Sequence, residues 1–121
     1  MTLKKINQGE IWLANLNPRK GTEPGKNRSV LIIQNQTLLD VAHPSTLIIP
    51  LTTHLIDNAH PLRMRVPAQE NLKEDSDLLI DQIRAIDNKR LIEGPLTQLT
   101  NTLMTQVFQY IDQIMGNLIK K

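Results

Sequence analysis

Residues 9–33 read GEIWLANLNPRKGTEPGKNRSVLII, in which two strand-like runs flank a charged loop. The first run, residues 9–16, ends at Asn17-Pro18, and the second, residues 29–33, is uninterruptedly apolar. Because the loop contains glycine and proline, we expect two rigid strands to hold the ends of a polar loop. Such a loop can place a few side chains against a flexible ligand, such as a nucleic-acid backbone.

The charge of this loop is mostly positive. Arg19, Lys20, Lys26 and Arg28 are opposed there by Glu23 alone, whereas the whole chain carries a net charge of only +2 at pH 7. A local positive field suits a phosphate backbone. The alternative interpretation is an ordinary solvated surface loop. The chain has one Trp, one Tyr and one Phe, too few for a base-stacking platform.

Length and composition predict one domain that spans residues 1–121 and has a single core. No apolar run approaches the roughly 20 residues that a membrane helix needs. The N-terminus lacks the apolar segment of a secretory signal. The absence of cysteine excludes disulfides and thiolate metal sites. We therefore expect a cytoplasmic protein with no membrane role.

Further strands are expected along the chain, at residues 46–52, 62–66 and 77–86. A helical turn is expected near Leu38-Leu39, and a tight turn at residues 87–90. Within residues 62–66, apolar and basic residues alternate strictly, so Arg63 and Arg65 are expected to face outward.

The C-terminal segment changes to a helical period, with Thr100 or Asn101 as candidate caps. Its main apolar stripe consists of Leu103, Val107, Tyr110, Ile111, Ile114 and Leu118. A second apolar set widens this face: Met104, Phe108, Met115 and Ile119. The helix could be sunk between barrel and loops, or it could form a dimer contact. Together these elements predict a mainly β fold, a compact β-barrel with a C-terminal helix.

Six motifs resemble the MazF/PemK family of type II toxin–antitoxin endoribonucleases, or mRNA interferases, in order and spacing. They are GEIWL (9–13), LNP (16–18), GTE (21–23), RSVLI (28–32), PLT (50–52) and DQIRAIDNKRL (81–91). The resemblance implies a small SH3-like barrel of the CcdB/PemK type and a homodimer. It also implies sequence-specific cleavage of single-stranded mRNA without metal or other cofactor, and inhibition by a MazE-like antitoxin.

Cleavage of RNA through its own 2′-hydroxyl requires deprotonation of that hydroxyl, stabilisation of the pentacoordinate phosphate and protonation of the departing 5′-oxygen. Because no water nucleophile takes part, no metal is obligatory. The expected products are a 2′,3′-cyclic phosphate and a 5′-hydroxyl end.

Arg28 is the first catalytic candidate, because a guanidinium matches the oxygens of a phosphate and stays charged. Thr52 is the second, since its hydroxyl could donate to the same phosphate, although Thr53 could be confused with it. Glu23 and Asp81 match acidic positions of the family. Each could accept the 2′-hydroxyl proton, orient Arg28, or serve only as a salt-bridge partner.

The resemblance and the charge pattern also yield a set of expected RNA-binding residues: Arg19, Lys20, Thr22, Lys26, Asn27, Thr53, His54 and Arg84. The chain departs from the family pattern at three positions. Lys26 replaces a usual glycine, Ser29 replaces a usual proline, and Leu79 stands where some relatives have a catalytic arginine. These departures affect the path of the loop and the acid–base arrangement.

Three alternatives remain. His43, His54 and His60 could supply an acid–base pair, and His54-x2-Asp57-x2-His60 could bind a metal, although this spacing matches no strong metal pattern. A gyrase-poisoning toxin of the CcdB kind would share the barrel but act by protein binding. A catalytically weakened family member would bind RNA or antitoxin without cleaving.

Overall fold

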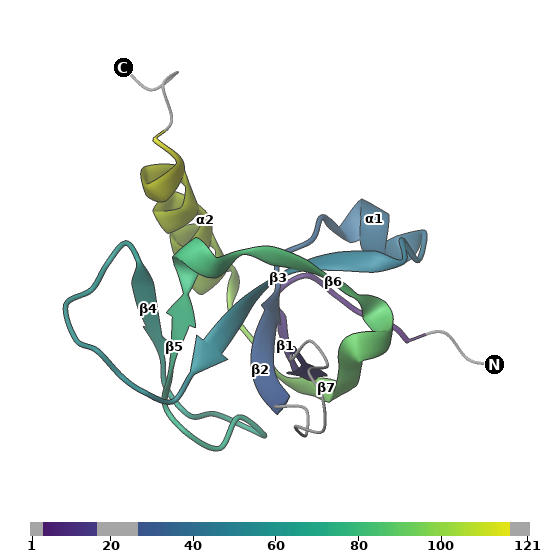
Figure 1. Cartoon of the computed structure of the whole chain (residues 1–121), viewed down its shortest axis with the longest axis horizontal. Helices are drawn as coiled ribbons and strands as arrows, with labels where there is room; N and C mark the ends of the chain where they lie inside the picture. Colours follow the sequence, from purple (N-terminus) through teal and green to yellow (C-terminus); the bar gives the residue numbers. More distant parts are fainter. Residues whose placement is uncertain (1–3, 17–26, 117–121) are drawn as a thin grey trace, which may run out of the picture.

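The computed structural model describes residues 4–16 and 27–116, which form a mainly antiparallel β structure with two α-helices (Figure 1). The strands are β1 (Glu10–Asn15), β2 (Asn27–Ile32), β3 (Ser45–Thr52), β4 (Arg63–Val66), β5 (Ser76–Leu79), β6 (Arg84–Asp87) and β7 (Leu91–Gln98). The helices are α1 (Gln36–Asp40) and α2 (Asn101–Met115), and the short 3-10 turns are η1 (Ile80–Gln82) and η2 (Asn88–Arg90). None of the helices in the described ranges is long and apolar enough to cross a membrane.

The strands pair in the order β4-β5-β3-β2-β1-β7, and β6 also pairs with β3. The expected mainly β fold with a C-terminal helix is thus confirmed. Between the described strands, however, the pairing leaves the barrel open, with β4 and β7 at the two ends of this order. The tight turn expected at residues 87–90 is also present, as η2.

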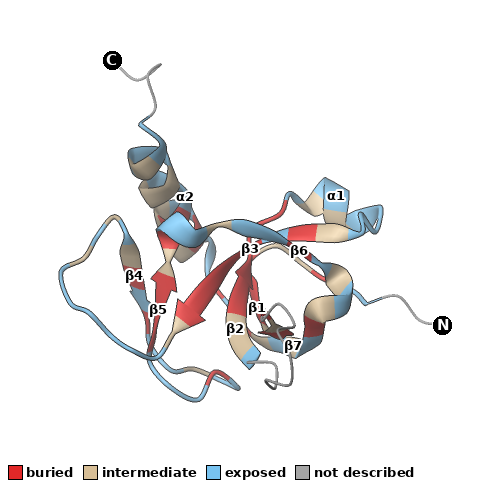
Figure 2. Cartoon of the chain, viewed as in Figure 1, coloured by how far each residue is buried: buried red, intermediate tan, exposed pale blue. Residues whose placement is uncertain are grey.

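The uninterrupted apolar runs in β2 and β3 are explained by burial on both faces of the sheet. On one face, Leu31 and Ile49 belong to a core that also contacts α2. On the other face, Val30 and Ile48 belong to a second core that includes Trp12. Because successive residues of a strand point to opposite faces, a strand buried on both faces needs apolar residues at consecutive positions. Figure 2 shows this burial along β2 and β3.

The strand expected over residues 77–86 is wrong as a single element. The structure divides this segment into β5, η1 and β6, which follow one another along the same edge of β3. Between the pairs Leu51↔Leu78 and Ile48↔Arg84 the register shifts by three residues, and η1 accommodates them. The shift lies beside Pro50, which has no N–H for a ladder hydrogen bond. Periodicity alone could not reveal a register set by a distant strand.

Strand β7 was not expected from the sequence. Its eight residues contain Gly94 and Pro95, which normally argue against a strand. The structure places β7 beside β1 at the end of the strand order, where a missing N–H is tolerated. Gly94 also faces the indole of Trp12, and a Cβ added at this glycine would lie only 2.3 Å from Trp12 Cδ2.

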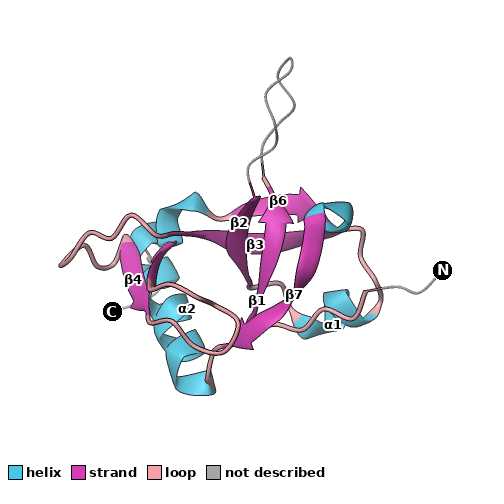
Figure 3. Ribbon diagram, turned by 90° about the horizontal axis from the view of Figure 1, so that it is seen from below, coloured by secondary structure: helices cyan, strands magenta, loops and turns pink. Residues whose placement is uncertain are grey.

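Helix α2 packs its apolar stripe on the core beside β4, whereas α1 lies at the other end of the molecule (Figure 3). Thr100 caps its start by accepting from the Leu103 N–H, as expected, and left-handed Gly116 ends it. Of the second apolar set, Met104 is buried, whereas Phe108 and Met115 are 38% and 74% exposed. The wide apolar face is therefore only partly covered in this chain.

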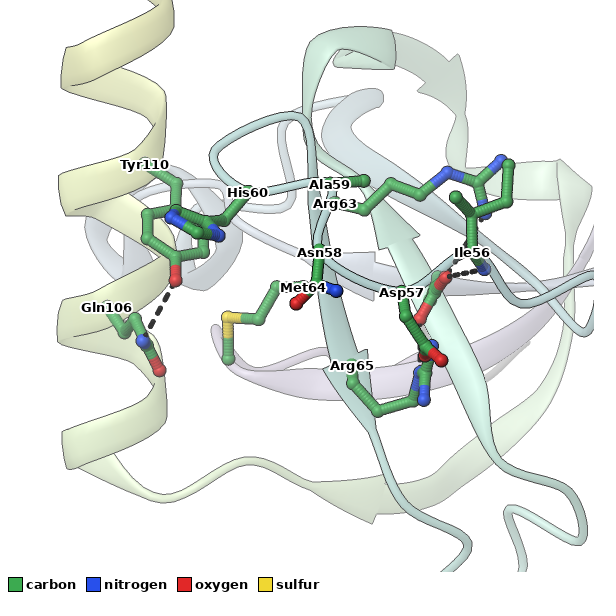
Figure 4. A pocket seen from close by; sticks show the side chains of 11 residues that line it. Ile56, Asp57, Asn58, Ala59, His60, Arg63, Met64, Arg65, Gln106 and Tyr110 are labelled. Atoms are coloured by element: carbon green, nitrogen blue, oxygen red, sulfur yellow. Dashed lines mark hydrogen bonds and ion pairs between the residues drawn. The ribbon is translucent and has the colours of Figure 1, made fainter.

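The buried carboxylate of Asp77 connects β5 to β4 and to the loop that follows β3. Figure 4 labels its partners Ile56, Arg63 and Arg65. Asp77 is only 1% exposed, and it accepts from Arg63 Nη1 at 3.1 Å, Arg65 Nε at 2.6 Å and the Ile56 N–H at 3.0 Å. Arg65 also donates to Asp57 at 2.7 Å. We call Asp57, Arg63, Arg65 and Asp77 the Asp77 network. Burial by itself would raise the pKa of Asp77, but hydrogen bonds from Arg65, Ile56 and Arg63 outweigh it and lower this pKa.

Gly94→Ala is expected to destabilise the protein by about 1–3 kcal/mol, because the new methyl group would collide with the buried Trp12 ring. Urea unfolding followed by the fluorescence of Trp12, the single tryptophan, measures the change. Gln98→Ala, at an exposed position of the same strand, is the control and should stay within about 0.5 kcal/mol of wild type. An equally stable Gly94→Ala variant would contradict the packing described here.

Asp77→Asn should lower the free energy of unfolding at pH 7 by about 3 kcal/mol. The substitution removes the buried carboxylate charge and leaves two arginine side chains without their negative partner. The pKa of Asp77 is lower in the folded state than its ordinary value of 3.8. Its contribution to stability is therefore complete above pH 4 and is lost as the pH falls through the folded pKa.

Urea unfolding at pH 7 and at pH 3 should thus show a larger acid-induced loss for wild type than for Asp77→Asn. Asp112→Asn, which removes an exposed carboxylate of α2, is the matched control and should keep the wild-type pH dependence. The same acid-induced loss in wild type and Asp77→Asn would contradict the lowered pKa.

Candidate active site

A cavity of about 350 Å³ opens where β2 begins and β3 ends. The antiparallel register between the two strands ends at the pair Val30↔Pro50, so the start of β2 and the end of β3 lie beside each other just beyond this pair. The cavity is lined by Leu13, Asn27, Arg28, Ser29, Leu51, Thr52, Thr53, His54 and Ser76. Arg28 and Thr52, which are far apart in the sequence, therefore line one cavity because their strands are paired.

Thr52 is the last residue of β3 and is half-buried. Its Oγ1 accepts a hydrogen bond from the His54 backbone N–H at 3.1 Å. Because this bond uses a lone pair of the hydroxyl, the hydroxyl hydrogen stays available for donation. Thr52 can therefore act as a hydrogen-bond donor towards a ligand in the cavity.

Arg28 is half-buried in β2, where it pairs with Ala14 of β1. Within the described residues, no hydrogen bond or ion pair holds its guanidinium. Its planar group of donors is thus available for an anion with several oxygens, such as a phosphate. Ser29, found where the family usually has proline, lies within β2 and lines the same cavity.

Three other expected RNA-binding residues, Asn27, Thr53 and His54, also line this cavity and are exposed. The structure does not bring Asp81 and Arg84 to the cavity, although both are exposed, on η1 and β6 respectively. The other expected site residues lie outside the described ranges: Arg19, Lys20, Thr22, Glu23 and Lys26.

The sequence interpretation missed Ser76, which contributes to the cavity from β5. A neighbouring cavity of about 340 Å³ shares four lining residues with the first: Leu13, Ser29, Thr53 and Ser76. This second cavity extends past the loop between β4 and β5 towards Glu93 of β7. The two cavities offer room for an extended ligand on one side of the Arg28–Thr52 pair.

A third cavity, of about 490 Å³, lies between the Asp77 network and α2 (Figure 4). His60 stacks on Tyr110 at its helix side, with the ring centroids 6.2 Å apart. His54 lines the first cavity, whereas His43 contacts Ser45. In residues 4–16 and 27–116, no three His, Cys, Asp or Glu side chains gather in a group that could hold a metal ion.

Asp77 was also missed as a candidate of interest. It lies beside Thr52 in the β3–β5 register, so the buried charge is next to the cavity that Arg28 and Thr52 line. The available signal was an aspartate at the start of the apolar run SDLLI, combined with two arginines at alternate positions of another strand. The sequence did not show that these charges would meet.

Comparison with proteins of known structure agrees with this architecture. The chain superimposes on a crystal structure of MazE–MazF from Deinococcus radiodurans with a TM-score of 0.76 and 18% identity, over 94% of this chain and 98% of that one. It resembles the Mycobacterium tuberculosis toxin MazF-mt6 with a TM-score of 0.71 and 20% identity, over 88% and 96% of the two chains. At these identities the likeness establishes the fold.

Sequence comparison gives a match of higher identity and identifies a family. A curated relative, Endoribonuclease MazF of Staphylococcus epidermidis, is 36% identical over 112 residues, which make up 92% of each chain. The sequence model described as "PemK-like, MazF-like toxin of type II toxin-antitoxin system" matches residues 7–115. With a match of this extent, and with the fold in agreement, the chain belongs to the family of PemK-like, MazF-like toxins.

Proposed function

We propose that this toxin is an endoribonuclease that cleaves single-stranded RNA, chiefly mRNA, at short sequences. The observation that carries the proposal is that Arg28 and Thr52 line one cavity at adjacent strand ends. The 36% identical relative named Endoribonuclease MazF supports the same activity. A cavity lined by a guanidinium and a hydroxyl donor suits a phosphodiester.

In the proposed reaction the 2′-oxygen of one nucleotide attacks the adjacent phosphorus. The bond from phosphorus to the 5′-oxygen breaks, so the products are a 2′,3′-cyclic phosphate and a 5′-hydroxyl end. A single strand is favoured because the attacking and departing oxygens must lie in line, which a stacked duplex hinders. Neither a water nucleophile nor a metal is required for this displacement. The departing 5′-oxygen takes up a proton from solvent in the cavity, and a carboxylate accepts the proton of the 2′-hydroxyl.

Arg28 and Thr52 would stabilise the charge that develops on the non-bridging oxygens in the transition state. The guanidinium supplies two parallel donors and a permanent positive charge. The Thr52 hydroxyl hydrogen adds a neutral donor, while the oxygen of the same hydroxyl accepts from the His54 N–H. Preorganised donors of this kind typically contribute a factor of about 10²–10³ each.

The proton of the 2′-hydroxyl needs an acceptor near Arg28. We assign this role to Glu23, which stands five positions before Arg28 in the sequence. Asp81 lies on an exposed turn and does not line the cavity, so we give it no step in the reaction. Asn27, Thr53 and His54 line the same cavity, and they would contact the RNA backbone beside the cleaved bond.

We further infer that the toxin is inhibited by a cognate antitoxin and acts as a homodimer. Proteins of the same fold include an endoribonuclease in complex with its cognate antitoxin from a mycobacterial species, at a TM-score of 0.69 and 16% identity. An acidic antitoxin segment would compete with RNA for Arg28. The exposed Phe108 and Met115 on α2 offer apolar surface for the second copy.

Purified protein should cut a long single-stranded RNA into discrete fragments in excess EDTA. The fragments should carry 5′-hydroxyl and 2′,3′-cyclic phosphate ends, which sequencing of enzymatically phosphorylated ends would locate. A 2′-deoxy substitution at the cleaved nucleotide should block cutting there, because it removes the attacking group. Loss of cutting in EDTA would exclude the metal-free reaction, and an intact RNA pool under all conditions would point to a weakened, binding-only member.

Arg28→Ala and Thr52→Ala should each lower kcat by at least about 10²-fold while the protein stays folded, because each removes a donor to the transition state. Cleavage of a fluorescent oligonucleotide that contains one mapped site gives the rates. Lys89→Ala and Thr105→Ala, at exposed positions away from the cavity, are the matched controls. Equal activity of the Arg28 or Thr52 variant and its control would remove that residue from the proposed mechanism.

A further inference from the structure

The loop after β3 is tied to the Asp77 network at several points. Asp77 accepts from the Ile56 N–H at 3.0 Å, and Arg65 donates to Asp57 at 2.7 Å. Arg63 makes a third tie, because its Nη1 donates both to Asp77 at 3.1 Å and to the His54 carbonyl at 2.8 Å. These bonds hold a loop whose residues 53–58 are exposed.

Arg63 is connected to Thr52 through two hydrogen bonds of the His54 backbone. The carbonyl of His54 accepts from Arg63, and the N–H of the same residue donates to Thr52 Oγ1 at 3.1 Å. His54 is therefore held by a hydrogen bond on each side of its Cα. Its orientation decides which lone pair of the Thr52 hydroxyl is used, and hence the direction in which that hydroxyl can donate.

We propose that Arg63, anchored on the buried Asp77, is a positioning residue that orients the Thr52 hydroxyl through the His54 backbone. The inference rests on the proposed function, because it assigns a role within the reaction at the Arg28–Thr52 cavity. Arg63 itself does not line that cavity. Its effect on cleavage would be indirect, exerted through the geometry of residue 54.

Arg65 has the properties of a matched comparison. It also donates to Asp77, and its second contact is Asp57, with no bond to His54 among the described contacts. Removing either arginine deprives the same buried carboxylate of one cationic partner. A difference between the two variants would therefore report on the His54 tie rather than on the loss of an ion pair.

The experiment compares Arg63→Met with Arg65→Met in the full-length protein, with both folds checked by circular dichroism and Trp12 emission. Arg63→Met should lower kcat about tenfold, with KM within twofold of wild type, because a misplaced donor weakens the transition state more than RNA binding. Arg65→Met should keep kcat within twofold. If Arg63→Met does not fold, Arg63→Gln replaces it, since this shorter, uncharged side chain cannot hold Asp77 and His54 together.

A second readout does not depend on cleavage. In ¹⁵N-labelled protein, Arg63→Met should shift the His54 amide resonance and speed its hydrogen exchange, as should Thr52→Val, which lacks the acceptor. Arg65→Met should leave both unchanged. Equal losses of kcat in the two arginine variants, or an unchanged His54 amide in Arg63→Met, would overturn the inference. If wild type cleaves no RNA, the proposed function fails, and the amide measurements alone then decide whether Arg63 positions residue 54.

Discussion

The structure depends on the pairing of β3 along both of its edges. One edge pairs with β2, and the other pairs first with β5 and then with β6. The first pairing puts the start of β2 beside the end of β3, where Arg28 and Thr52 line one cavity, and the second places the buried Asp77 beside Thr52. The cavity and the core therefore both include residues of β3, whose residues 48–51 are buried, and the Asp77 network lies beside the end of the same strand.

The residues around the C-terminal end of β3 contribute both to stability and to the candidate site. A buried carboxylate is costly unless it is paired and hydrogen-bonded, and two arginines with one backbone N–H meet that need. The Asp77 network also forms hydrogen bonds with the loop that follows β3. For the proposed cleavage of RNA, this network would give the donors at the end of β3 a rigid support.

Much of the fold could be predicted from residue patterns. The helix cap at Thr100, the alternation of residues 62–66 and the apolar runs of β2 and β3 all follow from local physics. Two elements could not be predicted in this way. Strand β7 was hidden by Gly94-Pro95, which only an end position of the sheet tolerates, and η1 was hidden because a register shift depends on the partner strand.

For the site, the sequence by itself determined the candidate chemistry. Its motifs pointed to Arg28 and Thr52, since a guanidinium and a strand-end hydroxyl suit a phosphodiester. Only the tertiary structure decided which charges lie beside that pair. Asp77 is buried next to Thr52, whereas Asp81 is exposed on η1. The reason is physical: Asp77 is buried by contacts with residues 12 to 25 positions away, and Asp81 lies on the 3-10 turn at the register shift between β5 and β6, so no local pattern encodes either environment.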